Sequence, residues 1–132
     1  MNRKAFTLIE LMLVVIIIGV LAAMVMPRLV GRSEQARMVA TRSDIDANIA
    51  LALDMFEVDN GRYPTTEEGL SALNKNPGTL SNWKGPYLKK EPRDGWGNVY
   101  IYKFPGIHNQ DYDLYSKGPN GQDSDKDDIG NW

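Results

Sequence analysis

The chain has 132 residues, of which 42% are hydrophobic and 24% charged, and a formal net charge of −2. This length suits about one domain, and the near-neutral charge excludes a broad basic surface of the kind that binds nucleic acid. The absence of cysteine excludes a disulfide framework and a thiolate metal site, and the single histidine, His108, argues against a His-rich metal site. The apolar residues are concentrated at the front of the chain, and the remainder is polar and rich in Gly and Pro.

The N-terminal part is apolar from Phe6 to Met26, apart from Thr7 and Glu10. A helix needs about 20 apolar residues to cross a hydrocarbon core of about 30 Å, so this segment is long enough for one span. Glu10 is unexpected there, because a carboxylate within a membrane helix costs roughly 2.5–3.5 kcal/mol on insertion scales. It would reach the nearby cytoplasmic interface, or pair with a cation of another chain or with a newly exposed α-amino group.

Two interpretations of this segment compete. A cleaved secretory signal would have its basic region at Arg3 and Lys4 and its cut near Ala23, but the apolar run exceeds the usual length of about 7–15 residues. A retained membrane helix fits the length better, and the preceding positive charges place the N-terminus in the cytoplasm. Arg28 and Arg32 follow the span and weaken this charge asymmetry.

The residues FTLIELMLVVIIIGVLAAMVMP, which begin at Phe6, resemble the class III signal of type IV pilins and type II secretion pseudopilins. In that family a prepilin peptidase cuts before the phenylalanine and methylates its new amino group. The resemblance implies cleavage between Ala5 and Phe6, and it makes Glu10 the characteristic glutamate of the fifth mature position. The sequence departs from the family at Ala5, where glycine is preferred. We hypothesise that the Phe6 amine of one subunit neutralises Glu10 of its neighbour, which makes Glu10 an assembly residue.

Beyond the span, the sequence predicts that the helix continues to Val58, because apolar residues recur at three-, four- and seven-residue spacing. The members of this stripe are Met38, Ile45, Ile49, Ala52 and Phe56. We interpret the stripe as core packing against a small domain. The helix is expected to be loosened near Gly19 and across residues 26–31, since Pro27 removes one main-chain hydrogen bond.

Two short runs in the rest of the chain predict strands, Val99 to Phe104 and DYDLYS at residues 111–116. Gly, Pro, Asn and Asp residues bound them, as is typical of turns. The expected fold class is α+β and pilin-like: a long N-terminal helix, whose first half spans the membrane, packed on a small antiparallel sheet. His108 lies in the loop between the strands with no nucleophile beside it in sequence, so we expect no catalytic role.

The segment RYPTTEEGLSAL predicts a short helix capped by Thr65 or Thr66. The adjacent carboxylates of Glu67 and Glu68 would point apart, so we expect a solvated face rather than an acid–base pair. With DGWGNVY and the terminal DIGNW, this segment resembles the major pseudopilin of type II secretion systems, and the resemblance covers essentially the whole chain. Gly95 stands where that family usually has proline, so a looser turn is expected. Ordinary type IV pilins often carry a cysteine pair, and its absence favours the pseudopilins.

The C-terminal stretch SKGPNGQDSDKDDIGNW is rich in Asp, Asn and Gly. Calcium takes roughly six to eight oxygen ligands from carboxylates, amides and main-chain carbonyls. The stretch lacks the glycine and the later glutamate of an EF-hand, so its spacing leaves a calcium site and a solvated acidic loop equally open. The resemblance to major pseudopilins implies one bound Ca²⁺. Its ligands would be the Leu114 carbonyl, the Asn120 side chain, and carboxylates among Asp125, Asp127 and Asp128.

Together, these features predict a structural subunit and not an enzyme. Residues 1–5 would be the leader, 6–27 the transmembrane and filament-core helix, 28–60 its amphipathic continuation, and 61–132 a periplasmic region with a calcium-binding loop. By resemblance, the chain would be a single-pass protein of the bacterial inner membrane. A prepilin peptidase would process it, and an inner-membrane assembly platform would polymerise it, with other pseudopilins, into a periplasmic filament that supports export of folded proteins. No nucleic acid partner is expected. The alternatives are a type IV pilin or minor pilin and, in another class, a secreted calcium-binding module with an ordinary signal peptide.

Overall fold

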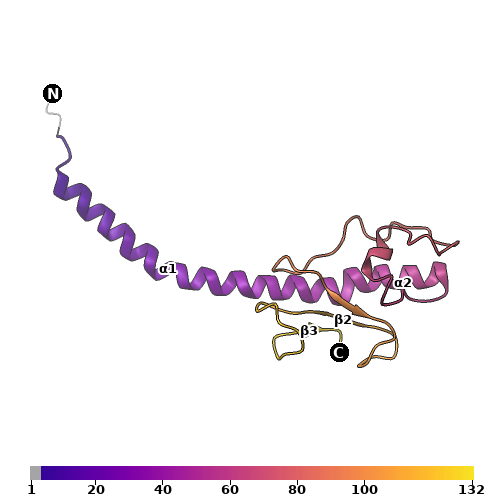
Figure 1. The fold of residues 1–132 in the computed structure, drawn as a ribbon. Coiled ribbons are helices and arrows are strands. Elements are labelled where there is room, and N and C mark those ends of the chain that lie inside the picture. The colour runs from indigo at the N-terminus through magenta and orange to yellow at the C-terminus, as the bar shows by residue number, and fades with distance from the viewer. Residues whose placement is uncertain (1–3) are drawn as a thin grey trace. The chain divides into compact units, whose positions relative to one another are not determined.

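The computed structural model describes residues 4–132, except for the side chains of residues 27–30 (Figure 1). The chain divides into two compact units, Met1–Ala36 and Arg37–Trp132. Helical residues follow one another from Leu8 to Asn60 as α1 (Leu8–Ser43), the π-helical turn η1 (Asp44–Asn48) and α2 (Ile49–Asn60). The later elements are the 3₁₀ helix η2 (Leu70–Leu73) and the strands β1 (Ile101–Lys103), β2 (Asp113–Ser116) and β3 (Ile129–Gly130).

The first part of α1 exposes apolar side chains all round. The large ones between Leu8 and Met26 are 48–76% exposed. Within the described residues, one helix is long and apolar enough to cross a membrane. The predicted loosening near Gly19 and across residues 26–31 is wrong, because α1 is continuous there. Pro27 removes only one main-chain donor, and the helix continues on both sides of it.

The packed face of the helix confirms most of the predicted stripe. Ile45, Ile49, Ala52 and Phe56 are at most 2% exposed, whereas Met38 is 46% exposed and its expected burial is wrong. The buried face begins instead with the polar Thr41, which a search for apolar residues misses. The π-helical turn η1 was also not predicted, because spacings of three and four residues do not distinguish a widened turn from an ordinary one.

The helix ends at Asn60, two residues beyond the predicted end, because Gly61 adopts the left-handed conformation (φ 77°) and donates to the Glu57 carbonyl at 2.7 Å. The predicted strands are confirmed in β1 and β2, although both are shorter than expected, and β3 was not predicted. The sheet has the order β1-β2-β3 with antiparallel pairing throughout. In the unit Arg37–Trp132, the buried residues of η1, α2, η2 and the strands form one hydrophobic core.

The segment before η2 contains a reciprocal cap. The Glu68 N–H donates to Thr65 Oγ1 at 3.2 Å, and the Thr65 N–H donates to Glu68 Oε2 at 3.0 Å. Thr65 thus caps the turn at residues 66–69, whereas the helix η2 begins after Gly69 without a side-chain cap, so the predicted capping of the short helix by Thr65 or Thr66 is wrong. The expected solvation of Glu68 is wrong, because Arg62 donates two hydrogen bonds of 2.9 Å to its carboxylate. The Arg62 hydrogen bonds lower the pKa of Glu68 below its usual value.

Candidate assembly and metal sites

The predicted processing site lies in exposed, non-helical backbone immediately before α1. Residues 4–7 are not helical, and the Phe6 side chain is 83% exposed. Thr7 and Glu10 cap the helix reciprocally: the Glu10 N–H donates to Thr7 Oγ1 at 3.3 Å, and the Thr7 N–H donates to Glu10 Oε2 at 3.5 Å. Lys4, Ala5, Phe6 and Glu10 are all exposed and border one open hollow. The structure thus brings Ala5, Phe6 and Glu10 together at one end of the helix. The Thr-x-x-Glu pattern of a capping box would have identified Thr7 in the sequence.

The acidic C-terminal loop folds around the Asn120 side chain. Asn120 Nδ2 donates to Asp125 Oδ2 at 2.6 Å and to Asp127 Oδ2 at 3.1 Å. Asp128 lies on the same loop, where its Oδ2 accepts the N–H groups of Ser124 at 2.9 Å and Asp125 at 3.3 Å. Four of the five predicted ligands are therefore brought into one loop.

The oxygen donors of this loop are of the chemical type that a hard cation takes as ligands. The amide nitrogen of Asn120 lies between the carboxylates of Asp125 and Asp127. Two negative charges on either side make this a place that favours a positive charge. Rotation of the amide by half a turn would present its oxygen there instead. Asp128 Oδ1 is buried without a hydrogen-bond partner among the described residues, and a buried, unpaired carboxylate oxygen is costly unless a donor or a cation binds it. As the structure stands, no group of three or more His, Asp or Glu side chains within residues 4–132 is arranged to hold a metal.

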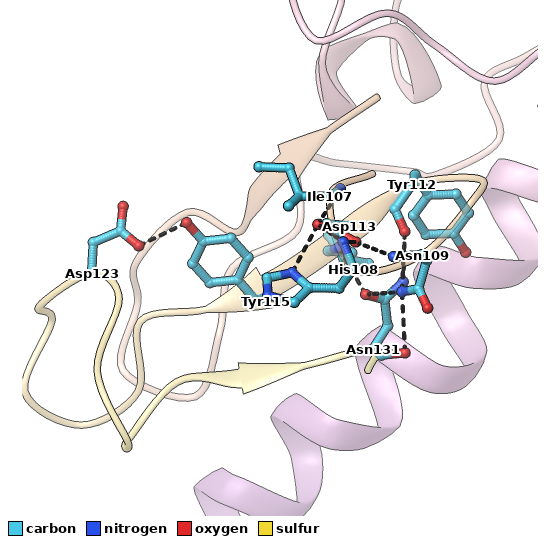
Figure 2. Close-up of polar contacts among 9 residues, drawn as sticks. Ile107, His108, Asn109, Tyr112, Asp113, Tyr115, Asp123 and Asn131 are labelled. Carbon is cyan, nitrogen blue, oxygen red and sulfur yellow. Dashed lines mark hydrogen bonds and ion pairs between the residues drawn. The ribbon is translucent and has the colours of Figure 1, made fainter. Parts of the chain in front are cut away.

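Leu114, the fifth predicted ligand, lies on β2. Its carbonyl accepts the Asn131 N–H at 3.1 Å, next to the pairing of β2 with β3. One lone pair of the carbonyl remains for another donor or a cation. The loop also has an anchor that the sequence analysis missed: the Tyr115 hydroxyl on β2 donates to Asp123 Oδ1 at 2.7 Å (Figure 2). This bond lowers the pKa of Asp123 below its usual value.

A second missed feature is the buried carboxylate of Asp113, at the start of β2 (Figure 2). It accepts main-chain N–H groups from residues 107–109 at 2.8–3.3 Å and lies 3.0 Å from Nδ1 of His108. Burial by itself would raise the pKa of Asp113, but these hydrogen bonds lower it to about 2. The His108 ring stacks on Trp132 with centroids 3.9 Å apart. His108, for which we expected no catalytic role, therefore connects two parts of the chain. It lies on the loop before β2 and packs on the C-terminal residue Trp132.

The turn that contains Gly95 is held at several points by hydrogen bonds, and a turn looser than that of the family stays a prediction. Asp94 Oδ1 accepts the N–H groups of Trp96 and Asn98 at 3.0 and 2.9 Å. Asp94 Oδ2 accepts the Ser116 hydroxyl at 2.7 Å, which ties the turn to β2. Gly95 itself donates to the helix, as its N–H lies 2.9 Å from Thr41 Oγ1.

The long apolar helix, the exposed segment before it and the small antiparallel sheet define a class, that of the pilin-like proteins. The family model described as the prokaryotic N-terminal methylation motif matches residues 1–26. A crystal structure of the major pseudopilin from the type 2 secretion system of enterohaemorrhagic Escherichia coli is similar, with a TM-score of 0.67 and 38% sequence identity. The similarity covers 79% of this chain and 89% of that chain. The predicted fold class is therefore confirmed.

The particular family follows from the rest of the chain. The model for the type II secretion system protein G matches residues 28–132. The chain is 50% identical over 138 residues to the type II secretion system core protein G of Pseudomonas aeruginosa, covering 99% of this chain and 96% of the relative. It is 47% identical over 136 residues to that of Escherichia coli (strain K12), covering 99% and 92%. The chain belongs to the type II secretion system protein G family, the major pseudopilins, whose members are structural proteins and not enzymes. The predicted resemblance is confirmed.

Proposed function

We propose that the chain is the filament subunit of a type II secretion pseudopilus. The observation that supports this most directly is the first part of α1, whose apolar side chains are exposed all round within the subunit. Such a surface must be covered by lipid before assembly and by other helices afterwards. The chain would insert as a single span of the bacterial inner membrane, with the unit Arg37–Trp132 in the periplasm.

Assembly would begin with cleavage before Phe6 by a prepilin peptidase and methylation of the new amine. Both events need access to the backbone, and residues 4–7 are exposed and non-helical. The amine of Phe6 in one copy would then neutralise Glu10 of the next copy, which removes the cost of an unpaired carboxylate among apolar helices. A head-to-tail contact of this kind builds an open filament where its rotation does not close a ring.

The other partners are part of the same proposal. Copies of this chain and other pseudopilins would form the filament on an inner-membrane assembly platform, and its growth would support export of folded proteins across the outer membrane. Bound Ca²⁺ would supply positive charge that fixes the acidic loop. Asn120, Asp125, Asp127, Asp128 and the Leu114 carbonyl are the groups that would hold it. The unpartnered oxygen of Asp128 supports this assignment.

The test of the proposed function is the mature N-terminus together with the filament. Mass spectrometry of the chain from its native host should find N-methylated Phe6, and cross-linking of intact cells should capture a series of oligomers that contain it. A mature chain that begins after Ala23 would refute the proposal in favour of a secreted protein. Surface pili that persist after deletion of the outer-membrane secretion channel would refute it in favour of a type IV pilin.

A further inference from the structure

The outer edge of the sheet has an open position at Tyr102 on β1. Among the described strands, β1 pairs only with β2, where Tyr102 lies opposite Leu114. Both main-chain groups of Leu114 point away from β1, since its carbonyl accepts the Asn131 N–H and its N–H donates to Asn131 Oδ1, each at 3.1 Å. Opposite residues of an antiparallel pair direct both main-chain groups either towards each other or apart. The N–H and carbonyl of Tyr102 therefore face the outer edge.

The edge already has partners on either side of Tyr102. Two residues further along, the Phe104 N–H donates to Thr66 Oγ1 at 3.0 Å, and the Thr66 hydroxyl donates to the Phe104 carbonyl at 3.0 Å. In the other direction, Val99 forms a bridge with Arg93. The outward N–H and carbonyl of Tyr102, by contrast, form no hydrogen bond with any other group of the described residues. The subunit thus leaves one donor and one acceptor of its edge open.

Tyr102 borders a groove along this edge, which we call the edge groove. Its lining consists of residues 66–71, 91–92 and 99–102. The groove is therefore bounded by the edge of β1 on one side and by the segment around η2 on the other. An extended chain rises about 3.3 Å per residue, the same as a strand, so three or four extended residues would span the open stretch at residues 100–103. Strands added at such an edge gain affinity from main-chain hydrogen bonds and specificity from neighbouring side chains.

The charged residues that line the edge groove are all acidic, and they are Glu67, Glu68 and Glu91. Glu68 is paired with Arg62 at 2.9 Å, and Glu91 lies 3.6 Å from Arg93 with both side chains about half exposed. Glu67 is exposed and forms no ion pair with any described residue. A lysine or arginine on a strand in the groove would supply the missing counter-charge.

We propose that the edge groove binds an extended, basic segment of another protein by β-strand addition at Tyr102. One residue of that segment would exchange two hydrogen bonds with the main chain of Tyr102, and a neighbouring lysine or arginine would contact Glu67. The chain itself has a formal net charge of −2, so a second copy is less complementary than a basic partner. All residues of the groove lie in the unit Arg37–Trp132, so the inference does not depend on the proposed filament.

The first experiment measures binding of fluorescein-labelled peptides KTVTK and ETVTE to the full-length chain in detergent by fluorescence anisotropy. KTVTK should bind more tightly, and methylation of its three internal N–H groups should weaken its binding about tenfold, because strand pairing loses its donors. Glu67→Gln should weaken KTVTK binding about two- to fivefold, the effect of one exposed ion pair. Asp46→Asn removes an exposed carboxylate outside the groove, and as the matched control it should bind like wild type.

Amide hydrogen exchange, measured by NMR on the same chain, reports the position of the peptide. The N–H groups of Ile101 and Lys103 face β2, whereas that of Tyr102 faces the groove. In the free chain the Tyr102 N–H should therefore exchange faster than both neighbours. Saturation with KTVTK should abolish this difference, because the peptide accepts the hydrogen bond.

Four results would overturn the inference. Equal affinity for KTVTK and its methylated form would show that strand pairing does not hold the peptide. Equal affinity for KTVTK and ETVTE, or an unchanged affinity in Glu67→Gln, would refute a basic partner. Bound KTVTK that leaves the exchange of Tyr102 unchanged would place the peptide elsewhere. Slow exchange of the Tyr102 N–H in the free chain, becoming fast on dilution, would assign the groove to a second copy.

Discussion

The main-chain N–H of Gly95 donates a hydrogen bond of 2.9 Å to Oγ1 of Thr41, which is fully buried on the packed face of the helix. A Cβ atom at Gly95 would lie 2.7 Å from Cβ of Arg37 and 2.8 Å from its carbonyl oxygen. The turn therefore lies too close to the helix for any side chain. We expect Gly95→Ala to destabilise residues 28–132 by about 1–3 kcal/mol, because the main chain of the helix cannot move aside easily. Urea unfolding measures this change.

Gly95→Pro should be more destabilising than Gly95→Ala, although the family usually has proline here. Proline adds the same crowding and also removes the N–H that Thr41 accepts, which costs about a further 1–3 kcal/mol where the group is buried. Thr41→Val is the matched control: it removes only the hydrogen-bond acceptor and should cost less than either Gly95 variant. An unchanged urea midpoint for Gly95→Pro would show that this contact does not form in solution.

Glu10 has two roles that variants can separate, a cap for α1 and a charge for assembly. Glu10→Gln keeps the size and hydrogen-bonding capacity of the side chain but removes the charge, so filament yield should fall at least about tenfold while membrane insertion persists. Thr7→Val removes the reciprocal cap at a cost of about 1 kcal/mol but keeps the carboxylate, and it should retain most filaments. Immunoblots of cross-linked oligomers and of membranes give both quantities. Equal loss of filaments in the two variants would assign the defect to capping.

Calcium should stabilise residues 28–132 by mass action. At a concentration of 100 times its Kd the ion adds about 2.7 kcal/mol, which corresponds to a rise in Tm of roughly 10 °C or more for a domain of this size. Asp127→Asn should reduce the rise, and Asp111→Asn, an exposed aspartate outside the loop, should not. Scanning calorimetry with calcium and with a chelator provides the comparison. A Tm that does not respond to chelation would refute the calcium assignment.

Asp113 should make the stability of the same unit depend on acid pH. Its pKa is lowered to about 2 in the folded chain, against about 3.9 in an unfolded one. The stabilisation is therefore complete above about pH 5 and is lost progressively as the pH falls through about 2, with a total of about 2–3 kcal/mol. Asp113→Asn should lower the free energy of unfolding at pH 7 and flatten this acid dependence. Denaturant titrations between pH 2 and 7 measure both. An acid dependence in Asp113→Asn equal to that of wild type would contradict the assignment.

Much of the architecture could be predicted because its signals are local. Each of three signals lies within a single helix: the apolar run of membrane length, the glutamate after Phe6, and the apolar residues spaced three or four apart. Residues at this spacing lie on one face of a helix. The acidic loop was found in the same way, since Asn120 and its aspartates are neighbours in sequence. Met38 shows the limit of such patterns, because an apolar residue at the right spacing is still exposed where no other element covers it.

The sequence by itself determined the long helix, the approximate places of two strands, the processing motif and the composition of the acidic loop. Only the tertiary structure decided which distant groups meet, such as Gly95 with Thr41, 54 residues apart, and the Asp94 carboxylate with the Ser116 hydroxyl. Every residue except proline carries the same main-chain N–H group. A hydrogen bond that such a group donates to a distant side chain therefore has no signature in the sequence. Periodicity reports that a face is buried, and the fold of the whole unit decides what covers it.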